Sequence, residues 1–444
     1  MAAGSKRPER NHNWVRFCQL PSACCLLIVN MTNPFEVKIE KLVYGGAGLG
    51  RLEGKVVFVP FSAPGDRLLV KSIEDKKNFI RAATFKLLEA GPSRRSPLCL
   101  HFESCGGCQW QHLEYASQVN AKRQILEEIF HHRFPETREL PVNIRASPQE
   151  YGYRSRARIQ VRGFGADANV GFFRFQSYAI EDVEECPLLR PSLNHALRSI
   201  RDARSKSTGN PDLRQLEIAC SEEEGIWGST EVDSALDEGV SALSAAGGDH
   251  TDETMLRRTI GEFDYSLTPS TFFQANDFMI AELVATVRTL ATCARSGAAL
   301  DLFSGVGLFS LPLARRFEKV VAVENSPVAS RLCAVNAKAA GLDNIQFVCA
   351  DVSAWMKAVG SVAPPAYSLI VLDPTRSGAG PEVMNRIVEW APENVIYVSC
   401  DPQTLCRDLA LLPARDYEID HVEGLDLFPQ TYHFETIVRL RRRS

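Results

Sequence analysis

A cysteine and a glutamate near the C-terminus have residue types and positions suited to covalent catalysis. Cys400 follows the apolar run Asn394–Val398, and Glu435 lies thirty-five residues further along the chain. The run predicts a strand, and strand ends of an open α/β sheet are where such folds bind ligands. A thiolate is a nucleophile and a carboxylate can accept a proton. The alternatives are a buried core thiol at Cys400 and an ion-paired surface carboxylate at Glu435.

A glycine-rich segment upstream indicates a nucleoside site. Ala298–Leu302 predicts a strand, Gly305 and Gly307 a turn, and Leu308–Arg316 a helix. Glycines let the backbone approach a ligand at a helix N-terminus. The loop has neither the third glycine of a dinucleotide motif nor the lysine of a P-loop, so S-adenosylmethionine fits better. The alternative is a glycine turn in a buried core.

Three further predicted strands end at acidic residues. The runs 319–324, 345–350 and 367–372 lead to Glu324, Asp351 and Asp373. An acidic residue one β-α unit after the glycine loop is placed to accept hydrogen bonds from ribose hydroxyls. The alternation of strands and helices from 270 to the C-terminus predicts an α/β domain with a mostly parallel sheet.

Four cysteines have the spacing of a ligand set. Cys99, Cys105 and Cys108 form a C-x5-C-x2-C pattern in a glycine-containing loop, and Cys186 follows far downstream. Four thiolates can hold either an iron–sulfur cluster or a zinc ion. Buried, inert cysteines are the remaining alternative. The thirteen cysteines do not have the spacing of a secreted disulfide framework.

Charge is unevenly distributed along the 444 residues. The net charge is −4, but Gln215–Tyr265 alone carries thirteen acids and two arginines, so the remainder is basic. Tyr151–Tyr178 interleaves aromatics with arginines that include Arg154, Arg156 and Arg158. Such a mixture suits RNA contacts, although it also fits the solvent face of a strand. We expect the acidic stretch to be a surface insertion that points away from RNA.

The chain divides into four expected segments. Residues 1–31 predict a tail. Residues 32–91, with short alternating strands and glycine turns, predict a small OB-like β-barrel that either binds RNA or only packs. Residues 92–268 predict a mixed α+β domain with helices near 116–133 and 192–203, and 269–444 the α/β domain. No apolar span is long enough for a transmembrane helix, and we expect a cytoplasmic protein.

Together these motifs resemble the RNA uracil-5-methyltransferase family, and within it the members that act on 23S rRNA. The likeness runs from about residue 32 to the C-terminus. It covers the barrel, the cysteine loop and six short motifs, which lie at 270–276, 301–307, 323–324, 373–378, 397–402 and 428–436. The resemblance implies a TRAM barrel, a central domain with an iron–sulfur loop, and a Rossmann-like class I methyltransferase domain.

The resemblance also implies roles for individual residues. Cys400 would be the nucleophile and Glu435 the base, and Phe272 would stack near a flipped uracil. The S-adenosylmethionine site would be lined by Gln274, Phe303, Glu324 and Asp373, with Asp351 near the adenine. A four-iron–four-sulfur cluster would be held by Cys99, Cys105, Cys108 and Cys186. Two departures from the family pattern are Thr375 in Asp-Pro-Thr-Arg and Leu308 at a position that is often polar.

The expected function is methyl transfer to C5 of a uridine in 23S rRNA through a covalent Cys–C6 adduct. The expected partner is RNA, with no DNA, no membrane and a monomeric state. A tRNA methyltransferase of the same fold is the nearest alternative, which the barrel and the cysteine loop disfavour. A non-catalytic RNA-binding protein is disfavoured by the intact Cys400, Glu435 and Asp373. A small-molecule or DNA methyltransferase is disfavoured by the barrel and the arginine-aromatic segment.

Overall fold

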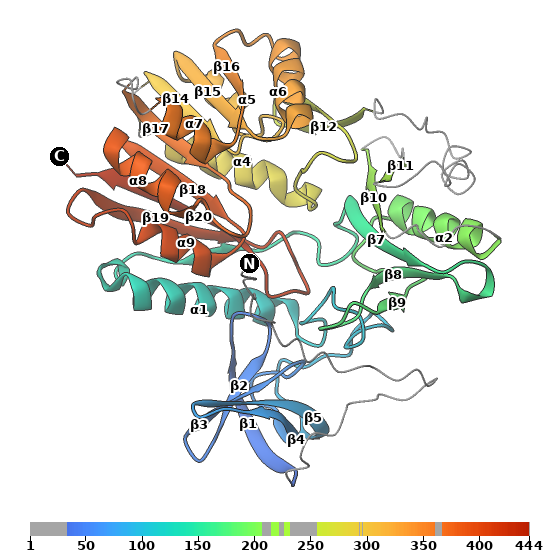
Figure 1. The fold of residues 1–444 in the computed structure, drawn as a ribbon. Helices are drawn as coiled ribbons and strands as arrows, with labels where there is room; N and C mark the ends of the chain where they lie inside the picture. The colour runs from blue at the N-terminus through green and yellow to red at the C-terminus, as the bar shows by residue number, and fades with distance from the viewer. Residues whose placement is uncertain are drawn as a thin grey trace, which may run out of the picture.

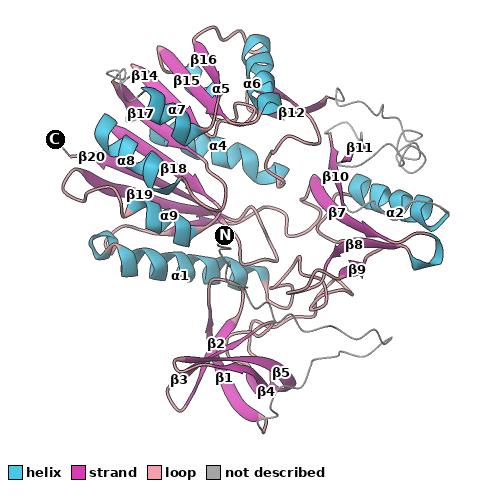
Figure 2. Ribbon diagram, viewed as in Figure 1, coloured by secondary structure: helices cyan, strands magenta, loops and turns pink. Residues whose placement is uncertain are grey.

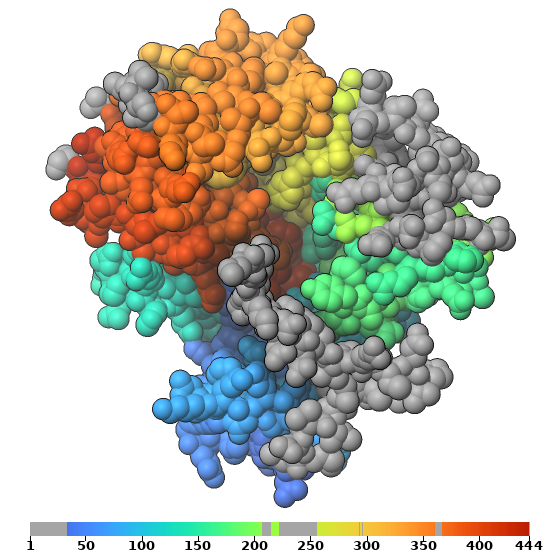
Figure 3. All heavy atoms as spheres, viewed as in Figure 1, coloured from blue at the N-terminus to red at the C-terminus, as the bar shows by residue number. Residues whose placement is uncertain are grey.

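A computed structural model describes residues 33–206, 215–221, 226–230, 255–292, 294, 296–359 and 366–443. The described chain folds into a barrel, a middle region and a large mixed sheet (Figure 1). The barrel forms a separate lobe at the bottom of the space-filling view (Figure 3). Most of the predicted acidic insertion, including 231–254, lies outside the described residues.

The N-terminal barrel closes from five strands in the order β1-β2-β3-β5-β4. Val37 and Ile39 of the first strand point inward while their neighbours are exposed, because side chains along a strand alternate between its two faces. The inward residues form a core of their own. The predicted small barrel is therefore confirmed. The bounds are β1 Phe35–Leu42, β2 Gly48–Leu52, β3 Lys55–Val59, β4 Arg67–Asp75 and β5 Phe79–Glu89.

The middle region combines helices with a five-stranded sheet in the order β11-β10-β7-β8-β9. Helices lie at 115–133 and 191–206, which confirms the two helices expected from the apolar spacing. The bounds are α1 Tyr115–Arg133, η1 Pro135–Thr137, β6 Asn143–Arg145, β7 Arg156–Arg162, η2 Gly165–Asp167, β8 Asn169–Phe173, β9 Ile180–Asp182, α2 Pro191–Lys206, β10 Gln215–Cys220 and β11 Ile226–Thr230.

The C-terminal part is built on an eight-stranded sheet with the order β16-β15-β14-β17-β18-β20-β19-β6. The first five of these strands are parallel, and β20 runs antiparallel between β18 and β19 (Figure 2). A separate two-stranded sheet is formed by β12 Leu256–Ile260 and β13 Phe263–Leu267. Besides β6, the strands of the eight-stranded sheet are β14 Ala298–Leu302, β15 Lys319–Glu324, β16 Ile345–Cys349, β17 Tyr367–Leu372, β18 Asn394–Ser399, β19 Tyr417–Leu425 and β20 Glu435–Arg442.

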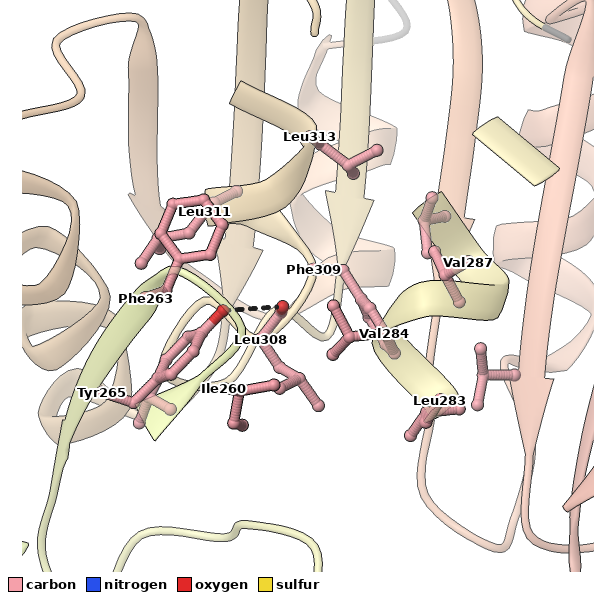
Figure 4. Packing of buried hydrophobic residues seen from close by; sticks show 14 of the residues in the cluster. Ile260, Phe263, Tyr265, Leu283, Val284, Val287, Leu308, Phe309, Leu311 and Leu313 are labelled. Atoms are coloured by element: carbon pink, nitrogen blue, oxygen red, sulfur yellow. Dashed lines mark hydrogen bonds between the residues drawn. The ribbon is translucent and has the colours of Figure 1, made fainter. Parts of the chain in front are cut away.

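Helices cover both faces of this sheet, so the central strands β17 and β18 are buried along their whole length. Separate apolar clusters fill the two faces. Figure 4 shows part of one cluster, in which the Tyr265 hydroxyl donates a 3.1 Å hydrogen bond to the Leu308 carbonyl. The helix bounds are α4 Asp277–Ala291, α5 Ser310–Ala314, α6 Pro327–Ala339, α7 Val352–Val359, α8 Gly380–Trp390 and α9 Pro402–Leu409.

Several segments that precede residue 268 pack into the large sheet's domain. β6 adds a parallel edge strand beside β19, and α1 lies along the same side of the sheet as α9 (Figure 1). Ile125 and Leu126 of α1 share an apolar cluster with β18 residues. The catalytic half of the molecule is thus completed by chain from the middle region.

Candidate active site

Six adjacent strands each bring one predicted site residue to a single edge of the large sheet. Parallel strands end at the same edge, and the antiparallel β20 begins there. The glycine loop follows β14, which lies between β15 and β17 in the sheet. The strand order reverses at this position, and open α/β sheets bind ligands at such a switch point. In sheet order the residues are Asp351, Glu324, Phe303, Asp373, Cys400 and Glu435.

Cys400 and Glu435 face each other across an antiparallel strand pair. Ser399 of β18 is paired with Thr436 of β20, so the next position of the ladder sets Cys400 opposite Glu435. On its other side Glu435 pairs with Leu425 of β19. Two residues distant in sequence are therefore neighbours at the site. The alternative of an ion-paired surface carboxylate is wrong, because Glu435 is buried and its Oε2 has no hydrogen-bond partner.

Burial controls the protonation of both groups. It raises the pKa of the Cys400 thiol to about 12, with a further contribution from the nearby Glu435 carboxylate. Burial also raises the pKa of Glu435 well above its usual range, and Asp373 adds to that rise. In the RNA-free protein the thiol and the carboxyl thus both favour their neutral forms. A catalytic thiol at this position needs a nearby group that stabilises the thiolate.

Arg376, the last residue of the Asp-Pro-Thr-Arg motif, is that group, and it was not among the predicted site residues. Its positive charge lowers the pKa of both Cys400 and Glu435, against the effect of burial. It comes from the loop after β17, in the motif that also carries Asp373. The sequence feature that could have identified Arg376 is its position three residues after the strand-end carboxylate Asp373. Arg376 joins Cys400, Glu435 and Asp373 in one electrostatic cluster.

The glycine loop has the backbone geometry expected of a ligand-binding turn. Phe303 and Gly305 both adopt positive φ angles, of 61° and 53°. A Cβ added to Gly305 would meet no atom within 4 Å, whereas one at Gly307 would meet the Cys333 sulfur at 2.7 Å. Gly305 therefore borders open space, and Gly307 is required by the close approach of α6.

Glu324 holds this loop through both carboxylate oxygens. Its Oε2 accepts a 2.9 Å hydrogen bond from the Gly305 N–H, and its Oε1 accepts one of 2.7 Å from the Ser326 N–H. A carboxylate oxygen has a second lone pair, so these bonds leave acceptor capacity for a ribose. Glu324 thus orients the glycine loop in addition to the ligand-binding role predicted for it.

Two further carboxyls lie at the same edge, of which Asp301 is buried and Asp373 half-buried. Burial raises the pKa of Asp301 and of Asp373 to about 7, and each lies at the end of one of two neighbouring strands. Asp301 was not predicted as a site residue; its carboxylate accepts a hydrogen bond from Ser310 at the start of α5. Asp351 accepts a 2.9 Å bond from the Ala354 N–H at the start of α7.

The segment between β13 and α4 separates buried from exposed residues. Gln274 and Phe273 are buried, while the Phe272 side chain is 74% exposed. An exposed aromatic ring in this position is available for stacking on a base. Leu308, one of the two expected departures from the family pattern, is part of the apolar core.

The four predicted ligand cysteines line one cavity. Cys99, Cys105, Cys108 and Cys186 surround about 40 Å³ of empty space together with Arg154. Burial raises the pKa of all four thiols, that of Cys105 to about 11. Within the described residues, no three His, Cys, Asp or Glu side chains are arranged so that they could hold a metal ion.

The arginines of β7 do not form the RNA-facing row that the sequence suggested. Arg156 is half-buried on the same face of β7 as Arg158. Its guanidinium donates to the carbonyls of Pro269 and Phe273, so it is not a free cation on the strand surface as the sequence suggested. Arg158 is exposed but paired with Glu217 of the adjacent strand. Side chains along β7 alternate between the two faces of the sheet, but the segment that contains Pro269 and Phe273 covers the part of the face that carries Arg156. The ring of Tyr178, by contrast, is 81% exposed.

Comparison with known proteins gives a consistent result. Residues 248–443 match the family model described as tRNA (Uracil-5-)-methyltransferase, and 35–93 match the TRAM domain of tRNA (uracil(54)-C(5))-methyltransferase. The chain is 32% identical to a 23S rRNA (uracil(1939)-C(5))-methyltransferase RlmD of Photorhabdus laumondii, over 91% of this chain and 96% of that protein.

Two other relatives extend the comparison. An uncharacterized RNA methyltransferase of Aquifex aeolicus is 31% identical over 92% of this chain and 98% of its own length. The crystal structure of Pyrococcus abyssi tRNA (uracil-54, C5)-methyltransferase in complex with S-adenosyl-L-homocysteine superposes with a TM-score of 0.71, at 26% identity over 91% of this chain and all of that one. No helix in the described part of the chain is long and apolar enough to cross a membrane.

Proposed function

Because the chain belongs to the RNA uracil-C5-methyltransferase family, an S-adenosylmethionine-dependent enzyme family, we propose that it methylates a uridine of 23S rRNA through a covalent Cys400 adduct. The observation that carries the mechanism is the pairing of a strand-end thiol with a buried carboxyl across β18 and β20. The glycine loop and its acidic neighbours provide the cofactor side of the same sheet edge.

The chemistry needs the thiolate first. C5 of uracil is a weak nucleophile, and attack of the Cys400 sulfur on C6 places electron density on C5 as an enolate. C5 then takes the methyl group from the sulfonium. Arg376 favours the thiolate that begins this sequence. Covalent attack divides one difficult step into two easier ones.

The second half of the reaction needs a base. After methyl transfer, C5 still carries its proton. Glu435 acts in its ionised form, which the charge of Arg376 favours against the effect of burial. Its carboxylate takes that proton, the electron pair of the C5–H bond re-forms the C5–C6 double bond, and the Cys400 thiolate leaves. The pairing of β18 with β20 fixes the position of the Glu435 carboxylate for this step. A positioned base contributes about a hundred- to ten-thousand-fold in rate. A uracil stacked in an RNA helix must leave its stack before the enzyme can reach it. The exposed Phe272 ring suits stacking beside the displaced uracil.

We also propose that the four cysteines hold a four-iron–four-sulfur cluster. About 10–15 Å³ of such space holds one water molecule, so the cavity of about 40 Å³ that these cysteines help to line has room for a group larger than one water. The donor set is four thiols from two segments, which is the ligation that such clusters use. When bound, the cluster supplies cationic iron that stabilises four thiolates. Anaerobically purified protein should contain roughly four irons per chain, and stoichiometric zinc without sulfide would contradict the assignment.

The 23S rRNA target is supported by the names of the relatives that match most of the chain, whereas the solved relative acts on tRNA. Mapping 5-methyluridine in rRNA and tRNA from a deletion strain decides between them. The expected result is the loss of one rRNA methyl group with tRNA unchanged. Loss confined to tRNA would contradict the rRNA assignment.

The mechanism is tested by two substitutions with labelled S-adenosylmethionine and rRNA fragments. Cys400→Ala should abolish both methyl transfer and adduct formation while cofactor binding is retained. Glu435→Gln should still transfer the methyl group but accumulate a covalent protein–RNA complex on a denaturing gel. Free turnover of Glu435→Gln without an adduct would exclude Glu435 as the base.

A further inference from the structure

The loop that connects β19 to β20 ends at the proposed base. Residues 426–434, here called the 426–434 loop, join Leu425 to Glu435, and these two residues pair with each other in the sheet. The loop contains no helix or strand. Its conformation therefore decides how the first residue of β20 enters the ladder, and with it the direction of the Glu435 carboxyl.

A buried ion pair holds the start of this loop. The Lys122 ammonium of α1 donates a 2.6 Å hydrogen bond to Asp426 and one of 3.1 Å to the Phe428 carbonyl. Both charged side chains are fully buried, and the ammonium lies 5.9 Å from the centre of the Trp110 ring. A buried ion pair is weak evidence for stability, because desolvation offsets the attraction of the charges. Its better-supported effect is to select one conformation.

A second set of bonds holds the middle of the loop. The Gln118 side-chain Nε2 donates a 2.9 Å hydrogen bond to the Gln430 Oε1, and the Gln430 backbone N–H donates one of 2.9 Å to the Gln118 side-chain Oε1. Gln430 has a φ of 70°, which is a strained conformation for a residue with a side chain. Such a conformation persists only where its surroundings enforce it.

The cysteine loop provides the third support. The backbone N–H groups of Gln109 and Trp110, directly after Cys108, donate to the Gln430 carbonyl at 3.1 and 3.0 Å. The 426–434 loop is thus fixed jointly by α1 and by the segment that leaves the predicted cluster. Neither support touches the reacting atoms.

We propose that Lys122 and Gln118 are positioning residues, which hold the 426–434 loop so that the Glu435 carboxyl faces the C5 proton. The inference rests on the proposed function, because it assigns these residues to the base-dependent half of that reaction. It also gives the cysteine loop a place in catalysis, since the backbone that follows Cys108 holds the Gln430 carbonyl.

Loss of the contacts from Lys122 or Gln118 should therefore slow proton removal selectively. A displacement of about 1 Å can lower a rate about a hundredfold. Cys400 is carried by the end of β18, and none of the bonds from Lys122 or Gln118 is made to that strand. Attack and methyl transfer should therefore be affected much less than proton removal. A general loss of structure would instead slow every step together.

The test uses the full-length protein and labelled S-adenosylmethionine in single-turnover reactions. Lys122→Met retains the length of the side chain without its charge, and Gln118→Met removes the bonds to Gln430. In each variant we expect release of methylated RNA to slow by about ten- to a hundredfold, with covalent adduct accumulating. Methyl transfer should change by less than about threefold. Lys319→Met, at the exposed opposite end of β15, is the matched control and should behave as wild type.

The outcomes separate this inference from the proposed function. Gln118→Met leaves no uncompensated buried charge, so it provides the test if Lys122→Met does not fold, as judged by thermal unfolding. Equal slowing of both steps in a folded variant, or unaltered release, would overturn the positioning role. If Glu435→Gln itself forms no adduct, the proposed mechanism fails instead.

Discussion

Substitution of Arg376 tests whether the protein itself activates the nucleophile. Among the groups that act on the Cys400 thiol, burial and the Glu435 and Asp373 carboxylates raise its pKa, and the Arg376 guanidinium lowers it. Arg376→Gln removes the positive charge while retaining a polar side chain. We expect the pKa of Cys400 to rise further and its thiolate fraction to fall.

The size of this effect follows from the structure. With a pKa of about 12, about one thiol in ten thousand is ionised at pH 8. A cation close to an ionisable group shifts its pKa by about one to three units. Loss of the same cation also raises the pKa of Glu435, which removes some of the negative charge beside the thiol. We therefore expect the lower end of the range, about a tenfold loss of thiolate.

The assay is alkylation of the RNA-free enzyme with iodoacetamide between pH 7.5 and 9.5, with modification at each cysteine followed by mass spectrometry. Alkylation of Cys400 should slow about tenfold in Arg376→Gln at every pH, since all lie below the thiol pKa. The exposed Cys349 is an internal reference that should not change. Arg376→Lys, which retains the charge, and Arg386→Gln on the outer face of α8 are the control variants.

An unchanged or faster reaction at Cys400 in Arg376→Gln, with Cys349 unaffected, would refute this reasoning. Such a result would mean that bound RNA, and not the protein, provides the charge that stabilises the thiolate.

The remaining predictions concern the proposed cluster, the glycine loop and Arg156. Cys186→Ser should lower the iron content of anaerobically purified protein and remove its visible absorbance, whereas Cys220→Ser, outside the cavity, should not. Gly307→Ala places a methyl group against Cys333 at a φ of 94°, so a loss of about 1–3 kcal/mol in unfolding free energy and weaker S-adenosylmethionine binding by calorimetry are expected. Arg156→Met should lower the melting temperature, because the carbonyls it satisfies lose a donor, and an unchanged melting temperature would contradict this.

The sequence by itself determined the parts whose signals are local. An apolar run followed by a polar residue marks a strand and its end, so β14 to β18 and the residues after them were predicted close to their observed bounds. Because parallel strands end at one edge, the placing of Glu324, Asp373 and Cys400 on the same edge followed from their positions alone. The cysteine spacing likewise predicted four neighbouring sulfurs, which line one cavity.

Only the tertiary structure decided which segments cover one another. It set Glu435 opposite Cys400 through the antiparallel insertion of β20, and it turned Arg156 toward the carbonyls of Pro269 and Phe273. It also buried Lys122 against Asp426, which lies far along the chain. The physical reason is that a periodic pattern specifies which side chains share a face, whereas burial, pKa and ion pairing depend on the distant chain that packs against that face.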